Sequence, residues 1–188
     1  MCGRLVNLTD AERLAEMFGA DLPINMPRLR QRWNVPPSAE VYVIGDNPIA
    51  GRRGIAVMSW GLVPYWWQGT RKEAVKPSNA RGETVAASPM FRESFARRRC
   101  IVPADGYYEW TRAGKVPHAF RPAGDRVFAL GGIWDSWDDT ETGEKRNTFA
   151  VVTTEPNELA ASIHDRMPVI RRRPATLLMG DTRPVEHR

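Results

Sequence analysis

The sequence has little of the material from which metal sites and disulfide frameworks are made. Only two of its 188 residues are cysteine, Cys2 and Cys100, and the three histidines lie far apart, at His118, His164 and His187. Two cysteines cannot build a disulfide framework or a four-cysteine zinc site. We therefore expect neither a structural metal nor a bound cofactor.

Long apolar segments are also missing. No run approaches the roughly 18 apolar residues that a membrane helix needs, and the opening Met-Cys-Gly-Arg lacks the basic-then-apolar pattern of a secretory signal. We expect a cytoplasmic protein with no membrane partner. The apolar fraction of 42% and the charged fraction of 26% are ordinary for a soluble globular chain, and the length suits one domain.

Acidic residues are outnumbered by basic ones, 22 to 27, which gives a net charge of +5. The excess belongs to residues 1–100, which carry 15 basic and 9 acidic side chains. Of the 27 cations 23 are arginine, whose planar guanidinium binds phosphate with two hydrogen bonds and stacks on bases. This favours an acidic polymer as partner, although GC-rich coding would also enrich arginine.

The hydrophobic pattern predicts more strands than helices. Residues 10–18 are expected to form a helix, because Thr9 and Glu12 have capping-box spacing and Gly19 follows. Strands do not alternate with helices in βαβ units, so the predicted fold class is α+β with mainly antiparallel strands. The β-rich runs are 41–44, 54–60, 100–102, 107–110, 126–134 and 148–153.

Two segments are expected to lack regular structure. Residues 21–38 contain four prolines, which limit any regular element. The chain after Ile170 has little apolar periodicity. The predicted organisation is one domain at residues 1–170 and a poorly packed tail at 171–188.

Cys2 is the most informative single residue. Methionine aminopeptidases remove Met1 when the second residue is small, so the mature chain is expected to begin at Cys2. Its α-amine, with a pKa of about 8, is roughly one-tenth free base at neutral pH, far more than a lysine amine. An amine and a thiol on adjacent carbons can condense with an aldehyde to an imine and then close a thiazolidine ring. The alternative is a small buried thiol at the start of the chain.

Three further stretches carry polar groups in rigid surroundings. Residues 77–84 either place Asn79 and Arg81 on one functional turn or supply a helix cap. Glu109 lies within an aromatic strand, as an outward-facing residue or as a buried acid. His164 precedes a proline turn between charged neighbours, either as a proton-transfer group or as a structural histidine.

Six motifs together resemble one known family, the SOS-response-associated peptidase (SRAP) family, which processes abasic sites in DNA. They occur in the family's order and spacing from Met1 to about Ile170. The motifs are the Met-Cys-Gly-Arg start, Trp33 to Ser38, Met58 to Pro64, Asn79 to Thr84, Gly106 to Trp110 and His164 to Pro168. The resemblance implies a single domain in which mainly antiparallel strands form a barrel-like core with short flanking helices.

The resemblance also implies a set of catalytic residues. Cys2, after loss of Met1, is the implied nucleophile that captures the ring-opened abasic deoxyribose as a thiazolidine. Asn79 is implied to hydrogen-bond the sugar or the adduct, and Glu109 to orient the Cys2 amine and move its proton. His164 is implied to protonate the sugar ring oxygen and open it.

The implied partner is single-stranded DNA that contains an abasic site, with a preference for 3′ junctions, and we expect a monomer. Arginines would grip phosphates, and two tryptophans would stack on bases or wedge between them. For these tryptophans a core position is the alternative. The implied DNA-binding residues are Arg4, Asn34, Trp66, Trp67, Arg81 and Arg166.

The resemblance further implies an associated lyase activity and autoproteolytic removal of Met1. The sequence departs from the family after Ile170, where members continue with an acidic, tryptophan-containing helix that residues 171–188 do not match. Two other functions stay open at this point: an N-terminal-cysteine peptidase, and a non-catalytic module that binds single-stranded DNA.

Overall fold

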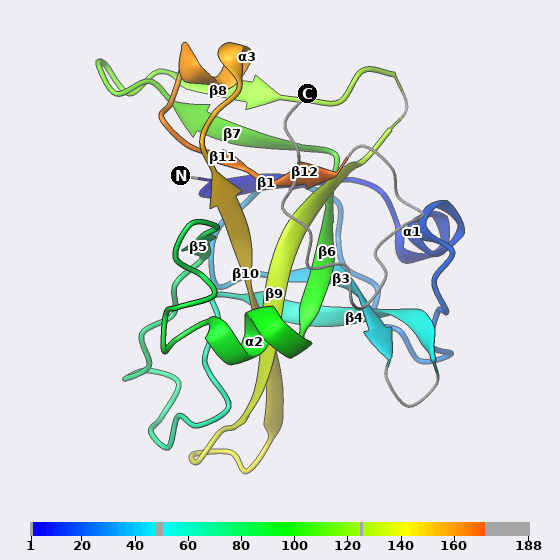
Figure 1. The fold of residues 1–188 in the computed structure, drawn as a ribbon. Helices are drawn as coiled ribbons and strands as arrows, with labels where there is room; N and C mark the ends of the chain where they lie inside the picture. The colour runs from blue at the N-terminus through cyan, green and yellow to red at the C-terminus, as the bar shows by residue number, and fades with distance from the viewer. Residues whose placement is uncertain (1, 48–50, 125, 172–188) are drawn as a thin grey trace.

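The computed structural model describes residues 2–47, 51–124 and 126–171. Strands dominate, and the helices are short (Figure 1). The helices of the described residues are α1 (Ala11–Phe18), α2 (Arg92–Arg97) and α3 (Glu158–Ala161). The strands are β1 (Arg4–Asn7), β2 (Arg32–Val35), β3 (Glu40–Asn47), β4 (Arg52–Trp60), β5 (Asn79–Arg81), β6 (Arg99–Ala104), β7 (Gly106–Trp110), β8 (Pro117–Phe120), β9 (Phe128–Asp138), β10 (Lys145–Thr154), β11 (Met167–Pro168) and β12 (Ile170–Arg171).

The larger sheet closes on itself. Its strand order is β11-β10-β4-β3-β6-β9-β12, and an additional pairing of β10 with β9 completes a circuit of β10, β4, β3, β6 and β9. Neighbours in the circuit are antiparallel except β4 and β10, which are parallel. Closure leaves the circuit without an open edge. The structure thus confirms the α+β class and the barrel-like core.

A second, four-stranded sheet lies against the barrel, in the order β2-β1-β7-β8. Figure 1 shows β1 and β7 running across the upper end of β6 and β10. One core cluster unites Leu5 and Tyr107 of this sheet with Trp60 and Phe149 of the barrel, all fully or almost fully buried. Burying side chains of this size contributes roughly 1.5–3 kcal/mol each. Cys2 belongs to the same cluster, so the core itself fixes the start of the chain.

Helix α1 confirms the predicted helix at 10–18, but its predicted cap is wrong. Asp10, rather than Thr9, accepts a hydrogen bond from the Arg13 N–H (2.8 Å). The Thr9 hydroxyl instead donates to the Asp105 carboxylate (2.6 Å), which a local pattern cannot reveal. Gly19 ends the helix in the left-handed conformation, at φ 57°, as a glycine can without strain.

All six predicted β-rich runs overlap strands, although β9 begins two residues into the run 126–134, and the structure adds other strands. Strand β2 lies inside the proline-rich segment at 21–38, which was expected to be irregular. It exists because β1 supplies its hydrogen bonds, with Leu5 opposite Val35. Strand β12 extends regular structure to Arg171, one residue beyond the predicted domain end. The predicted tail from residue 172 onward lies outside the described residues.

Candidate functional site

Cys2 lies two residues before the start of β1 and is fully buried. Strand β1 is flanked by β2 on one side and β7 on the other, so it occupies the middle of the smaller sheet. The register places Arg4 opposite Tyr108 of β7. The next residue of β7 is Glu109, and the antiparallel pairing therefore brings Glu109 toward the Cys2 end of β1. Met1 lies outside the described residues.

Strand β5 holds Asn79 against the start of the chain. It pairs in parallel with β10, with Asn79 opposite Val151. The carbonyl oxygen of Ser78 accepts hydrogen bonds from the indole of buried Trp60 (2.8 Å) and from the Val151 N–H (2.9 Å). The Asn79 side-chain amide donates to the Cys2 carbonyl oxygen (2.9 Å) and to the Ser78 hydroxyl (3.1 Å). The barrel wall therefore fixes the backbone from which Asn79 reaches Cys2.

Glu109 is a buried acid, with 3% of its surface exposed. Burial, and secondly the negative charge of Glu109, raise the pKa of the Cys2 thiol. Burial, and then the charges of Cys2 and Glu109, likewise raise the pKa of the Tyr107 hydroxyl. The thiol, the carboxylate and the phenol thus form one electrostatically coupled group, in which the thiol keeps its proton at neutral pH.

His164 lies in the turn between α3 and β11. Its Nδ1 accepts a hydrogen bond from the Arg166 N–H (3.0 Å) and lies 2.9 Å from the Asp165 carboxylate. One nitrogen cannot serve both neighbours in one protonation state. An unprotonated Nδ1 accepts from the Arg166 N–H, whereas a protonated Nδ1 donates to the Asp165 carboxylate.

The turn with His164 is tied to both flanking parts of the site. Asp165 forms an ion pair with Arg112, which follows strand β7 and therefore Glu109. Two residues further on, β11 pairs with β10 at Thr153 and Thr154. The same stretch of β10 pairs with β5. Asn79 therefore hydrogen-bonds Cys2 directly, Glu109 acts on the Cys2 thiol through its charge, and His164 is linked to both through the adjoining strands.

Arg166, a predicted phosphate ligand, is engaged within the protein. Its guanidinium makes two hydrogen bonds of 2.8 Å to the Glu83 carboxylate and another of 2.8 Å to the Thr153 carbonyl. The Glu83 hydrogen bonds raise the pKa of Arg166 and lower that of Glu83. These hydrogen bonds connect the segment that follows β5 to the turn before β11. Sequence reasoning missed Glu83 as the partner, although it lies four residues after Asn79 in the same motif.

The other predicted DNA-binding arginines are more available. Arg4 donates to the Asn34 side-chain oxygen (3.3 Å), which links β1 to β2 on the surface. Arg81, the last residue of β5, is exposed and forms no ion pair within the described residues. Both arginines lie close in sequence to the residues that meet at Cys2. Neither guanidinium forms an ion pair in the described ranges, so both keep N–H groups that can donate to a further partner.

The two adjacent tryptophans differ in environment. Trp66 is 48% exposed. Trp67 packs partly buried against the cluster of Val63 and Trp137, and its indole N–H donates to the Thr70 carbonyl (3.2 Å). Trp66 is thus the ring that is accessible to a base, and Trp67 anchors the loop that carries it.

The described part of the chain brings together no group of three or more histidine, cysteine or acidic side chains that could hold a metal ion. Within the same ranges, no helix is both long and apolar enough to cross a membrane.

Known proteins match nearly the whole chain. A family model described as SOS response associated peptidase (SRAP) matches residues 1–177. The chain is 36% identical over 173 residues to the abasic site processing protein YoqW of Bacillus subtilis, covering 90% of this chain and 75% of that protein. It is 31% identical over 181 residues to the abasic site processing protein YedK of Escherichia coli, again covering 90% and 75%.

A solved structure agrees with these sequence matches. The crystal structure of a protein from Bacteroides thetaiotaomicron superposes with a TM-score of 0.78 at 28% identity, covering 90% of this chain and 76% of that one. The described strands and the matched residues therefore define the same domain. The chain belongs to the SOS response associated peptidase (SRAP) family.

Proposed function

We propose that this protein processes abasic sites in single-stranded DNA by forming a covalent thiazolidine between Cys2 and the ring-opened deoxyribose. The observation that carries the proposal is the meeting of Asn79 and Glu109 at Cys2, the residue that becomes N-terminal once Met1 is removed. The names of the matched relatives, abasic site processing proteins, support the substrate class.

The first chemical step is the opening of the sugar. An abasic deoxyribose is a cyclic hemiacetal, and its C1′ becomes an aldehyde when the ring oxygen gains a proton and the C1′ hydroxyl loses one. The His164 imidazolium supplies the proton to the ring oxygen from Nε2, while its Nδ1–H donates to the Asp165 carboxylate. Asn79 has a buried side-chain oxygen with no hydrogen-bond partner among the described residues, and this oxygen can accept from a sugar hydroxyl.

The second step joins protein and sugar. The free α-amine of Cys2 attacks the aldehyde carbon, and loss of one water molecule gives an imine. The thiol sulfur then adds to the imine carbon while the thiol proton passes to the nitrogen, which closes the five-membered ring. Glu109, buried beside the thiol, is the group that transfers these protons.

Burial and the charge of Glu109 raise the pKa of the Cys2 thiol while Met1 is in place, and the terminal amine opposes this increase. The thiol therefore needs a proton acceptor when its sulfur adds to the imine carbon, because the thiolate is the nucleophile.

We include two further activities in the proposal. Cleavage of the Met1–Cys2 peptide bond by the protein itself would generate the free amine. The same imine also permits loss of a C2′ proton and expulsion of the 3′ phosphate, which is a lyase reaction. Both activities depend on the groups gathered at Cys2.

Incubation of the processed protein with single-stranded DNA that holds one abasic site tests the proposal. A heat-stable, slower-migrating band on a denaturing gel is expected with abasic DNA and not with intact DNA. A non-catalytic binding module would give a shift only on a native gel. A peptidase would give no shift on either gel, and both results would contradict the proposal.

A further inference from the structure

Strand β2 turns two successive side chains to solvent. Leu5 of β1 lies opposite Val35 of β2, and Asn7 lies opposite Arg32. The segment of β2 between these pairs is therefore one residue longer than the facing segment of β1. The extra residue is a β-bulge, which re-aims side chains that would otherwise alternate between faces. Trp33 and Asn34 are accordingly both exposed, and Trp33 has 56% of its surface accessible.

Trp33 forms a cation–π contact with an arginine. The Arg121 guanidinium lies 5.5 Å from the centroid of the indole. Arg121 follows β8, at the opposite side of the sheet from β2, and its side chain crosses above Gly106, where an added Cβ would lie 3.1 Å from the Arg121 Cγ. Gly106 thus leaves room for Arg121 to reach Trp33. Trp33 nevertheless stays exposed.

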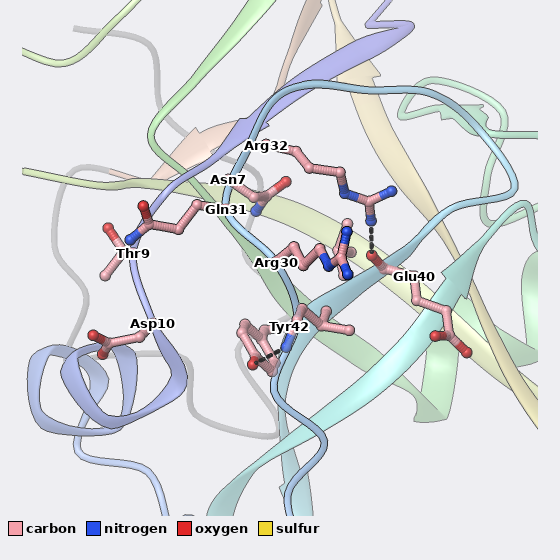
Figure 2. Close-up of a pocket in the computed structure, with 10 residues that line it drawn as sticks. Asn7, Thr9, Asp10, Arg30, Gln31, Arg32, Glu40 and Tyr42 are labelled. Carbon is pink, nitrogen blue, oxygen red and sulfur yellow. Dashed lines mark hydrogen bonds between the residues drawn. The ribbon is translucent and has the colours of Figure 1, made fainter.

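An open pocket lies at the Arg32 end of β2. It is lined by Arg30 and Arg32 together with polar and apolar side chains, among them Asn7, Leu29 and Tyr42. Arg32 donates to the backbone oxygen of Glu40 (3.0 Å), and Figure 2 shows Arg30 beside this contact.

The two carboxylates at this pocket form no ion pair with its arginines. The Glu40 carboxylate points away from both guanidinium groups in Figure 2. The Asp10 carboxylate caps α1 by accepting from the Arg13 N–H. Within the described ranges neither Arg30 nor Arg32 forms an ion pair, so both guanidinium groups remain able to bind an anion.

Nine of the 19 arginines in the described ranges form an ion pair with a carboxylate. The paired ones are Arg13, Arg28, Arg52, Arg53, Arg97, Arg98, Arg112, Arg146 and Arg166. Arg121, over Trp33, has no such partner in the same ranges. Unpaired arginines beside an exposed aromatic ring complement a phosphate backbone with unstacked bases.

The surface is continuous with the site at Cys2. Arg4, two residues after Cys2, bonds Asn34, the neighbour of Trp33. At about 3.3 Å per strand residue, the five residues from Cys2 to Asn7 span roughly 16 Å. A DNA strand that places one sugar at Cys2 can therefore place neighbouring nucleotides along β2.

We propose that the β2 edge, formed by Arg30, Arg32, Trp33 and Arg121, binds the unpaired nucleotides on one side of the abasic site. A base stacks on Trp33, and a phosphate occupies the Arg30–Arg32 pocket. The inference rests on the proposed function, because it extends the DNA path from the captured sugar. It makes binding tolerant of sequence, since every base has a face that can stack.

The test measures binding without the covalent step. The probe is single-stranded DNA that holds a tetrahydrofuran in place of the abasic sugar, which cannot open to an aldehyde. Flanks of one or six nucleotides are placed on either side. Wild-type protein should bind more tightly when one particular flank is lengthened, and Trp33→Ala should remove most of that gain, about tenfold for one stacked base. Trp33→Phe should restore most of it.

Arg30→Ala tests the phosphate pocket independently, at an exposed residue without hydrogen bonds in the described structure. It should reduce the slope of log affinity against log salt by about 0.7, the value for one phosphate contact on a single strand. Arg28→Ala is the matched control, because Arg28 is exposed, lies two residues away and is paired with Glu12. Its slope should equal that of wild type.

Three outcomes separate the possibilities. If Trp33→Ala and Arg30→Ala bind every probe as Arg28→Ala does while wild type still crosslinks abasic DNA, the β2 inference is wrong and the proposed function stands. If a polyaspartate peptide binds wild type as tightly as DNA and is equally sensitive to Trp33→Ala, the surface recognises acidic protein and the inference is again wrong. If wild type forms no crosslink, the proposed function itself fails.

Discussion

The side-chain amide of Asn79 donates a 2.9 Å hydrogen bond to the backbone carbonyl of Cys2, across 77 positions of sequence. The bond orients the residue that bears the reactive amine and thiol. It depends on β5, whose backbone is held by Trp60 and Val151 of the barrel. The barrel thus acts as the support on which the start of the chain is aligned.

Asn79→Asp should slow crosslinking. The change keeps the shape of the side chain but replaces the donor with a second acceptor facing the Cys2 carbonyl. We expect the single-turnover rate on abasic single-stranded DNA to fall about tenfold, corresponding to the loss of one hydrogen bond. Ser78→Ala is the control, because it removes only the 3.1 Å contact behind the amide. An unchanged rate for Asn79→Asp would exclude an orienting role.

His164→Ala should discriminate between two forms of the substrate. Ring opening needs a proton at the sugar oxygen, whereas an already open aldehyde does not. The variant should therefore react about a hundredfold more slowly than wild type with the cyclic sugar, within the range for general acid catalysis. With a pre-formed aldehyde on the same oligonucleotide the slowing should be much smaller. Equal slowing on both substrates would remove His164 from this role.

Glu83→Gln should lower stability in a pH-dependent way. The two hydrogen bonds from Arg166 lower the pKa of Glu83 below its usual 4.5, and Glu83 is 45% exposed, so screening limits the effect to about 1 kcal/mol. A melting temperature lower by about 2–4 °C at neutral pH is expected.

The sign of the pH dependence follows from the depressed pKa of Glu83. Its contribution is fully present above pH 4.5, where the unfolded carboxylate is also charged, and is lost as the pH falls through the lowered folded value. The difference in melting temperature between wild type and Glu83→Gln should therefore be constant from about pH 6 to 8 and shrink below 4.5. A difference that grows on acidification would contradict the Glu83–Arg166 account.

Arg81→Ala should weaken binding of single-stranded DNA equally for all sequences. Arg81 is exposed, and a phosphate contact carries no base information. The slope of log affinity against log salt should fall by about 0.7, measured by fluorescence anisotropy with pyrimidine-rich and purine-rich strands. Arg97→Ala, at an exposed arginine paired with Glu93, serves as the control. A change in base preference would argue against a phosphate role.

Local sequence patterns predicted the strands that are rich in β-branched residues and the helix at 10–18, because these elements bury apolar faces of regular period. They did not predict β2, since its stability comes from pairing with β1 about 30 residues away. The prediction of Thr9 as the helix N-cap was wrong for a similar reason, because the Thr9 hydroxyl donates to the distant Asp105.

The same contrast between local patterns and distant contacts holds for the candidate site. The motifs predicted which residues carry chemistry, and the structure brings Asn79 and Glu109 to Cys2. The state of each side chain depends on contacts distant in sequence. Arg166 is occupied by Glu83, 83 positions away, and Trp67 is partly buried whereas the identical neighbour Trp66 is exposed. No pattern distinguishes two adjacent tryptophans before the loop is packed.

The central claim, a sulfur-closed ring at Cys2, is tested most directly by mass mapping of the crosslinked product. Protein lacking Met1 is reacted with abasic single-stranded DNA, treated with borohydride and digested with trypsin and nuclease. The account predicts that the peptide Cys2-Gly3-Arg4 carries the sugar with the loss of one water and without the two hydrogens that reduction of an imine would add. Cys2→Ser should form only a reducible adduct. A sugar attached elsewhere, or a wild-type adduct that borohydride reduces, would contradict the account.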